Sequence, residues 1–248
     1  MIILKSKNEI EKMAVACRIV AEVLEVLVHA VRPGLTTLEL DTLAERSIRA
    51  RGGVPAFKGY RGFPSTLCVS VNEQVVHGIP SKRRLKAGDI VGLDLGAKWE
   101  GYYGDAAVTI PVGHIPSAAQ SLLATAQEAL YMGIKEVSPG KHLSDVSHAI
   151  QRCAEARGYS VVRAFVGHGI GTALHEEPQV PNFGPPGRGP RLKPGMILAI
   201  EPMVNIGGAD VEILDDGWTV VTVDAQLSAH FEHTLAITDE GPQILTAL

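Results

Sequence analysis

The chain repeats itself, and this internal repeat limits its architecture more than any single motif does. Residues 31–52 (VRPGLTTLELDTLAERSIRARG) align without gaps on residues 137–158 (VSPGKHLSDVSHAIQRCAEARG). Residues 85–94 (LKAGDIVGLD) then match residues 192–201 (LKPGMILAIE) at nearly the same offset. Because the segments recur in the same order, we favour two related halves over a chance match.

The repeat also pairs four acidic residues. The second match places Asp94 opposite Glu201. A looser third match sets YYGDAAVTI beside AHFEHTLAI, and it pairs Asp105 with Glu232. Two related halves are expected to face each other across a pseudo-two-fold axis, and such an interface is a natural ligand site.

Length and composition fit this architecture. The chain has 248 residues, 46% of them hydrophobic, which is enough for a sizeable core without disulfides. We expect one α/β domain over residues 1–248, with halves of about 1–112 and 113–248. A formal net charge of −4 argues against a basic nucleic-acid binder.

The same composition predicts a cytoplasmic protein. The three cysteines form no CxxC pair and leave an odd count, so a disulfide framework is not expected. The N-terminus becomes charged too early for a signal peptide. No apolar run is long enough to cross a membrane.

Hydrophobic period and end signals predict four helices. The first opens with a Ser6–Glu9 capping box and stops at Pro33. The expected helices cover about 6–32, 36–52, 117–138 and 144–158. The expected strands cover 67–71, 89–96, 101–111, 195–204, 218–224 and 229–238. The Pro- and Gly-rich stretch 181–195 is expected to be an irregular loop.

The acidic pair in the predicted hairpin is the first sign of chemistry. Asp94 (IVGLDLG) and Asp105 (GYYGDAAVT) each sit among apolar residues of a strand. A tight turn at Trp99-Glu100 would place them directly opposite each other on one sheet face. Such a pair is destabilising unless the two carboxyls share a proton or hold a metal.

Glu201 (AIEPM) and Glu232 (HFEHT) repeat the pattern of a lone acid inside an apolar strand. The alternative is that a lysine or arginine separately neutralises each of the four acids. No such residue lies in their immediate strand context, which weakens this alternative.

Histidines complete the set. The segment VGHGIGTALHEEP contributes His168 and His175, and VVHGIP contributes His77. His230 and His233 flank Glu232, and their roles are left open. One imidazole with four carboxylates is an oxygen-rich set that does not resemble a structural Cys/His zinc site and suits Mn, Fe, Co or non-structural Zn. Two divalent ions would balance four carboxylates, so the residues predict a two-metal hydrolase.

Five segments together resemble type I methionine aminopeptidases of the bacterial type, which have the pita-bread fold. They are NEQVVHGIP, DLGAKWEGYYGDAAVTIPVG, GHGIGTALHEEPQVPNFG, MILAIEPMV and SAHFEHTLAIT. The resemblance covers essentially the whole chain. It implies two pseudo-symmetric halves with a curved antiparallel sheet covered by helices. It also implies removal of the initiator methionine from nascent proteins when the second residue is small.

The resemblance implies two divalent ions, drawn from Co, Mn, Fe, Zn and Ni, and five ligands. Asp105 and Glu232 would bridge the ions, Asp94 would bind one, and His168 with Glu201 the other. A hydroxide that bridges the ions would attack the substrate carbonyl.

The implied roles of the remaining polar residues follow the same mechanism. Glu201 would also carry a proton as general acid and base. His77 and His175 would hydrogen-bond the substrate backbone and the developing oxyanion. Nascent polypeptides are the implied partners, with the ribosome as a further candidate, and the implied state is a monomer.

An apolar pocket for methionine is implied at six matching positions, where aromatic edges favour sulfur. They are Phe57, Tyr60, Phe63, Cys68, Leu174 and Trp218. Phe57 stands where related chains often have cysteine, Phe63 replaces a tyrosine, and Leu174 replaces an aromatic residue. These changes affect the pocket's size rather than the reaction. Cys68 is expected to be a buried wall residue rather than a reactive thiol.

Two alternatives from the sequence remain. A pita-bread peptidase that cleaves before proline usually carries an extra N-terminal domain, for which the chain has no room. A non-catalytic binding protein on the same fold would lack metal ligands, and here all five are present.

Overall fold

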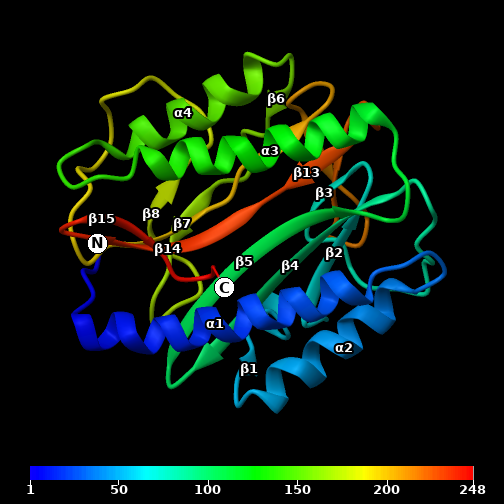
Figure 1. Ribbon diagram of the computed structural model, residues 1–248, viewed down its shortest axis with the longest axis horizontal. Helices are drawn as coiled ribbons and strands as arrows, with labels where there is room; N and C mark the ends of the chain where they lie inside the picture. The colour runs from blue at the N-terminus through cyan, green and yellow to red at the C-terminus, as the bar shows by residue number, and fades with distance from the viewer. Residues whose placement is uncertain (248) are drawn as a thin grey trace.

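The structure is a computed structural model, and it describes residues 1–247 (Figure 1). The helices are α1 (Lys7–Ala30), α2 (Thr37–Ala50), α3 (Ser117–Lys135) and α4 (Leu143–Glu155), with a short 3₁₀ turn η1 (Tyr60–Gly62). The first-half strands are β1 (Val54–Pro55), β2 (Leu67–Val71), β3 (Gln74–Val76), β4 (Ile90–Trp99) and β5 (Tyr102–Pro111). The second-half strands are β6 (Ser160–Val161), β7 (Gly167–Gly169), β8 (Glu176–Val180), β9 (Ile197–Ile200), β10 (Met203–Asn205), β11 (Val211–Ile213), β12 (Val220–Thr222), β13 (Ser228–His230), β14 (Glu232–Thr238) and β15 (Gly241–Ile244).

The main sheet joins the two halves symmetrically. Its central strand order is β1-β4-β5-β14-β9-β7-β8, and β2 and β15 pair with β4 and β14. The first half contributes β1, β2, β4 and β5, and the second contributes β7, β8, β9, β14 and β15. The halves meet at the antiparallel pair β5–β14, which lies between the two helix pairs in Figure 1. This arrangement confirms the predicted curved sheet of two pseudo-symmetric halves.

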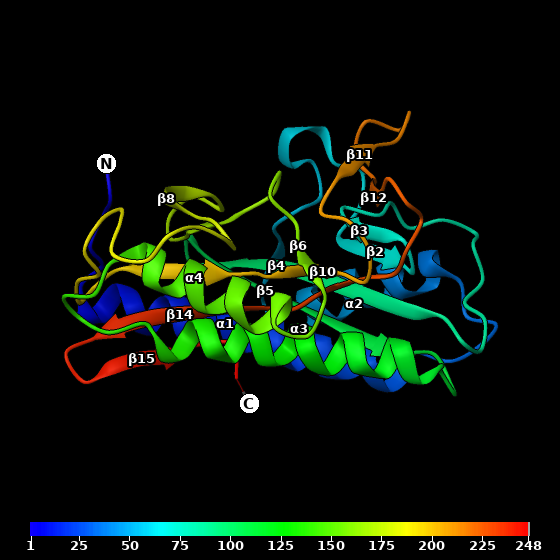
Figure 2. The same ribbon diagram turned by 90° about the horizontal axis from the view of Figure 1, so that it is seen from above.

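Helices and loops lie on opposite sides of this sheet. Figure 2 shows α1 and α3 on one side, while β8 and the β11–β12 hairpin project from the other. Leu24 of α1 packs with Leu93 of β4 in one core cluster, and Leu130 of α3 packs with Leu198 of β9 in another. Each fully buried leucine contributes about 1.5–3 kcal/mol. The helix side is thus the structural core, and the opposite side is free for a site.

The predicted helix starts hold for α1 and α2, whose capping boxes at Ser6–Glu9 and Thr36–Glu39 are formed. The start of α3 at Ser117 is also as predicted, and it follows Pro116, which makes no side-chain cap. One start is corrected. Helix α4 begins one residue before the predicted Ser144, because the Asp145 carboxylate accepts the free backbone N–H of His142 at 2.9 Å.

The register of the β4–β5 hairpin differs from the prediction. The turn lies at Glu100-Gly101, both with positive φ (43° and 89°), the geometry of the two-residue hairpin turns. Asp94 therefore pairs with Ala107, and Asp105 pairs with Gly96. The two carboxylates share a face but sit diagonally, so like charges are not directly opposed.

Two predicted strands are interrupted. The expected strand 195–204 divides into β9 and β10 around Glu201-Pro202, because proline cannot donate a ladder hydrogen bond. The expected strand 229–238 divides into β13 and β14 at Phe231. The stretch 181–195 is irregular, as predicted. None of the helices within residues 1–247 combines the length and apolarity needed to cross a bilayer.

Candidate metal centre and substrate pocket

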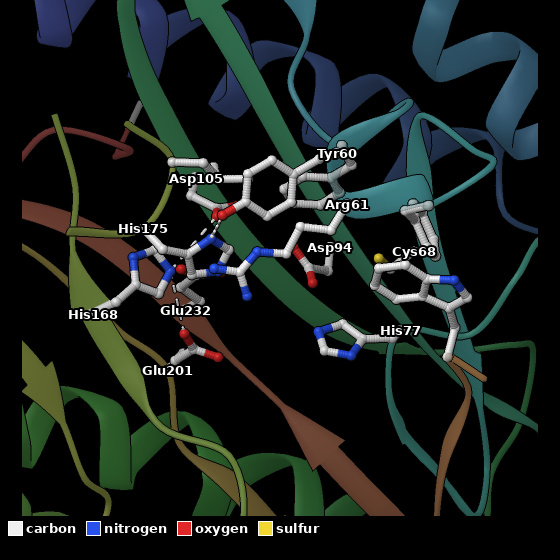
Figure 3. Close-up of a pocket in the computed structure, with 14 residues that line it drawn as sticks. Tyr60, Arg61, Cys68, His77, Asp94, Asp105, His168, His175, Glu201 and Glu232 are labelled. Atoms are coloured by element: carbon white, nitrogen blue, oxygen red, sulfur yellow. Dashed lines mark hydrogen bonds and ion pairs between the residues drawn. The ribbon is translucent and has the colours of Figure 1, made fainter. Parts of the chain in front are cut away.

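One cavity on the loop side of the sheet collects the residues that the sequence singled out (Figure 3). Asp94 and Asp105 reach it from β4 and β5, and Glu232 reaches it from β14. His168 comes from β7, and Glu201 from the break that follows β9. The four acids thus come from the inner strands of both halves, and they face one another across the β5–β14 junction.

The cluster is tight and mostly buried. One ligand atom from each of Asp105, His168 and Glu232 lies within 4.8 Å of the other two. His168 Nε2 lies 3.9 Å from Asp105 Oδ2 and 3.5 Å from Glu201 Oε1. His168 Nδ1 is 2.9 Å from the carbonyl oxygen of Gly169, which can accept a hydrogen bond from Nδ1–H and leaves Nε2 free to bind a cation.

Histidines are the only basic side chains near these carboxylates among the described residues. Within residues 1–247, no lysine or arginine lies within ion-pair distance of the four acids, so separate neutralisation is wrong. Burial, reinforced by Glu201, raises the pKa of Asp94 to about 7, against the opposing effect of His230. Burial likewise raises the pKa of Glu201 to about 7, against His168. Burial and neighbouring carboxylates raise the pKa of both Asp105 and Glu232 well above the ordinary range.

The donor set fits divalent cations. Among the described residues, one carboxylate oxygen each of Asp94, Asp105 and Glu232 is buried without a hydrogen-bond partner. Orphaned buried acceptors are rare, because each costs roughly 1–3 kcal/mol or more when charged. A cation held by these oxygens and by His168 Nε2 removes that cost. The mostly oxygen donor set is typical of catalytic rather than structural metal sites.

Two further histidines line the same cavity. Burial and the nearby His230 lower the pKa of His77 to about 4, so its ring is neutral at pH 7. The ring of His175 lies 4.2 Å from that of His168, measured between centroids. Its Nδ1 is 2.8 Å from the hydroxyl oxygen of Tyr60. Desolvation, followed by the positive charges of His168 and Arg61, lowers the pKa of His175.

The apolar wall contains all six residues predicted for the side-chain pocket, namely Phe57, Tyr60, Phe63, Cys68, Leu174 and Trp218. Trp218 meets Phe63 edge to face at 5.1 Å. The ring of Phe57 packs directly against Gly96. A Cβ atom at residue 96 would lie 2.6 Å from this ring, so a glycine there leaves room for phenylalanine in the wall. Cys68 is buried with a raised thiol pKa, as expected for a wall residue.

The sequence patterns do not assign two of the residues at this site, His230 and Arg61. His230 Nε2 lies 3.6 Å from Glu201 Oε2. The two-residue spacing between His230 and Glu232 could have predicted that both face the site, since alternate residues of a strand share a face. His233 instead faces the helix side, where its ring contacts Tyr131. Arg61 also lines the cavity, and no pattern in the sequence distinguishes it.

Comparison with known proteins agrees with this geometry. The model of metallopeptidase family M24 matches residues 11–239. The chain belongs to metallopeptidase family M24. It is therefore a metal-dependent hydrolase, and the buried group of Asp105, His168 and Glu232 is its candidate metal site.

Several relatives match this M24 chain over its whole length. It is 56% identical to "Methionine aminopeptidase 1" of Bacillus subtilis, with 99% of both chains covered. It is 54% identical to a methionine aminopeptidase of Clostridium perfringens, with 100% of both covered. Among solved structures, the methionine aminopeptidase of Thermotoga maritima matches with a TM-score of 0.99, 48% identity and full coverage of both chains. These likenesses confirm the fold and the family expected from the sequence.

Proposed function

We propose that this M24 metallopeptidase removes the N-terminal initiator methionine from nascent polypeptides whose second residue is small. One observation carries the proposal: a single cavity joins a cluster of buried carboxylates, three of which have an oxygen without a hydrogen-bond partner, to a wall of apolar and aromatic side chains. Full-length relatives that bear the name methionine aminopeptidase support it.

The five predicted ligands, Asp94, Asp105, His168, Glu201 and Glu232, would hold two divalent ions from the set Co, Mn, Fe, Zn and Ni. Asp105 and Glu232 are the most buried of the four acids, with 4% and 3% of their surface exposed, and they would hold the ions together with the other three ligands. When bound, the ions supply Lewis-acid activation of water and of the scissile carbonyl, and they neutralise the carboxylates.

The chain's own residues would perform the remaining work. The side chains of Phe63 and Trp218 would hold the methionine side chain, with aromatic edges toward its sulfur. Glu201 would accept a proton from the attacking water and deliver it to the leaving amine.

Two neutral imidazoles would act on the substrate carbonyl. His77 and His175 each offer one N–H donor when uncharged, and both have lowered pKa values. They would donate to the substrate backbone and to the oxygen that becomes negative in the transition state. Figure 3 shows the His175 ring beside that of His168, while the His77 ring lies apart from both, below Asp94.

We further propose that the protein acts as a monomer, with residues 1–248 as one catalytic unit. We place the enzyme in the cytoplasm, where nascent chains that emerge from the ribosome supply its substrate.

The test is parallel hydrolysis of Met-Gly-Met-Met and of Xaa-Pro peptides by metal-free protein reconstituted with each ion in turn. We expect cleavage of the methionyl peptide only, and its loss when a chelator is added. Preferential cleavage of Xaa-Pro peptides would rule out the assignment as a methionine aminopeptidase. Metal binding without any hydrolysis would favour a non-catalytic binding protein.

A further inference from the structure

Arg61 stands at the rim of the cavity in an unusual backbone conformation. It has φ 48° and ψ 23°, the left-handed region, between Gly59 (φ 86°) and Gly62 (φ 92°). Hydrogen bonds from Tyr60 N to Phe57 O and from Phe63 N to Tyr60 O close this turn. Left-handed backbone is uncommon for residues with a side chain, and it tends to persist where a function depends on it.

The turn presents the guanidinium to the cavity. Arg61 lies over the Tyr60 ring, with its Cζ 5.4 Å from the ring centroid. The close-up in Figure 3 shows the side chain reaching from the turn toward His175 and the carboxylate group. Arg61 is exposed and lines the cavity, so a bound peptide can meet it.

Among residues 1–247, three arginines pair with a carboxylate: Arg49 with Glu45, Arg51 with Glu22 and Arg157 with Glu128. Arg61 has no carboxylate within ion-pair distance in this part of the chain. It differs from the other unpaired arginines because it lines this cavity. A guanidinium forms its strongest contacts with carboxylates, which it can bind through two parallel hydrogen bonds.

The position of Arg61 fixes which part of a substrate it can meet. The Tyr60 ring lies 5.2 Å from the His175 ring, so the Arg61 guanidinium is within about 11 Å of His175, roughly three residues of extended peptide. If His175 contacts the scissile peptide bond, Arg61 meets a substrate residue no farther along than the fourth. The proposed function requires a small second residue, which leaves the third and the fourth.

We propose that Arg61 is a specificity-determining residue that binds a carboxylate on the third or fourth residue of the substrate. This proposal rests on the proposed function, because it takes the N-terminal methionine as the residue held in the apolar pocket. The carboxylate is either an acidic side chain or the C-terminal carboxylate of a short peptide. Both present the same chemistry to the guanidinium, and the experiment separates them.

The experiment compares metal-loaded wild type with Arg61→Gln and Arg61→Glu. One arm uses amidated Met-Ala-Glu-Gly against amidated Met-Ala-Gln-Gly, which isolates the side chain. The other uses Met-Ala-Gly as the free acid against its amide, which isolates the terminal carboxylate. In each arm, kcat/KM of the peptide that bears the carboxylate is divided by kcat/KM of the matched neutral peptide. This ratio is measured at low and at high salt.

We expect Arg61→Gln to lower this ratio by about two- to five-fold at low salt in at least one arm, the range of an exposed ion pair. Arg61→Glu should lower the ratio further, and high salt should remove the wild-type preference. The matched control Arg18→Gln changes an exposed arginine of α1, on the helix side, and should keep the wild-type ratio.

Cleavage of the neutral amides by wild type establishes the activity on which the proposal rests. Given that cleavage, equal ratios for wild type and Arg61→Gln in both arms overturn the role of Arg61 and leave the proposed function standing. No cleavage of any methionyl peptide overturns the proposed function, and the role of Arg61 with it.

Discussion

The hydroxyl oxygen of Tyr60 lies 2.8 Å from Nδ1 of His175, and the two rings stack at 5.2 Å with 24° between their planes. The residues are 115 positions apart in the chain. The contact joins the apolar pocket to a residue proposed to act on the substrate. If the phenol donates to Nδ1, the proton of the neutral imidazole is on Nε2, where it can be donated to a carbonyl oxygen.

Tyr60→Phe should therefore lower kcat by about five- to ten-fold, the effect of one hydrogen bond, with little change in KM. Ring stacking remains in this variant, so the loss reports orientation of the imidazole rather than packing. Steady-state kinetics across pH 6–9 measures the effect. Tyr102→Phe, which removes a phenol bonded to Glu9 of α1, is the control and should behave as wild type. Unchanged kcat in Tyr60→Phe would show that His175 needs no such support.

Glu201→Gln should lower kcat by about 10²- to 10⁴-fold, because glutamine keeps the shape of the side chain but can neither accept nor deliver the proton. Metal content, measured on the same sample, separates this effect from loss of a ligand. Glu212→Gln on the exposed strand β11 is the matched control. Near-normal turnover of Glu201→Gln would remove this residue from the proton transfer.

His77→Ala should reduce kcat by about 10²- to 10³-fold, the effect of losing one donor to the developing oxyanion. His77 meets the rings of Phe165 and Trp218 edge to face, and it lies outside the close metal-ligand group. Metal content should therefore stay at the wild-type value. Loss of one metal equivalent in this variant would make His77 a ligand instead.

Metal binding should strengthen as pH rises through about 7. The pKa values of Asp94 and Glu201 near 7 mean that the metal-free fold holds protons that the unfolded chain releases near pH 4. Between those values, these two groups make the metal-free fold less stable as pH rises. A bound cation displaces the protons, and it removes the loss of stability that ionised Asp94 and Glu201 cause in the metal-free fold.

The measurement is the increase in Tm on adding Mn²⁺ at pH 6, 7 and 8, with proton release followed by calorimetry in two buffers. We expect a larger increase in Tm at pH 8 than at pH 6, and more protons released at pH 6. An increase that does not vary with pH would contradict the raised pKa values.

Much of the fold could be predicted because its signals are local. The capping boxes at Ser6 and Thr36 join groups three residues apart, and period-two patterns reveal β4 and β14 within ten residues. The acids at Asp94 and Glu232 were recognisable because an ionised side chain in an apolar strand needs a partner. These signals require no knowledge of the rest of the chain.

The register of the β4–β5 hairpin was less predictable. The turn at Glu100-Gly101 rather than Trp99-Glu100 moves every cross-strand pair by two positions, and both turns leave Asp94 and Asp105 on the same face. The hydrophobic pattern alone is equally compatible with both turns, because the side-chain period is two. Gly101, with φ 89°, distinguishes them, because glycine adopts a positive φ more readily than Trp99.

The sequence by itself determined the repeated halves, most of the helices and strands, and the types of residue that the chemistry needs. Only the tertiary structure decided that Tyr60 meets His175, that His230 faces the site while His233 turns away, and that Arg61 stands unpaired at the rim. Capping hydrogen bonds and hydrophobic periodicity depend on residues that are close together in the sequence, so the sequence shows them directly. Contacts between segments a hundred residues apart depend on how the halves pack, which no local pattern records.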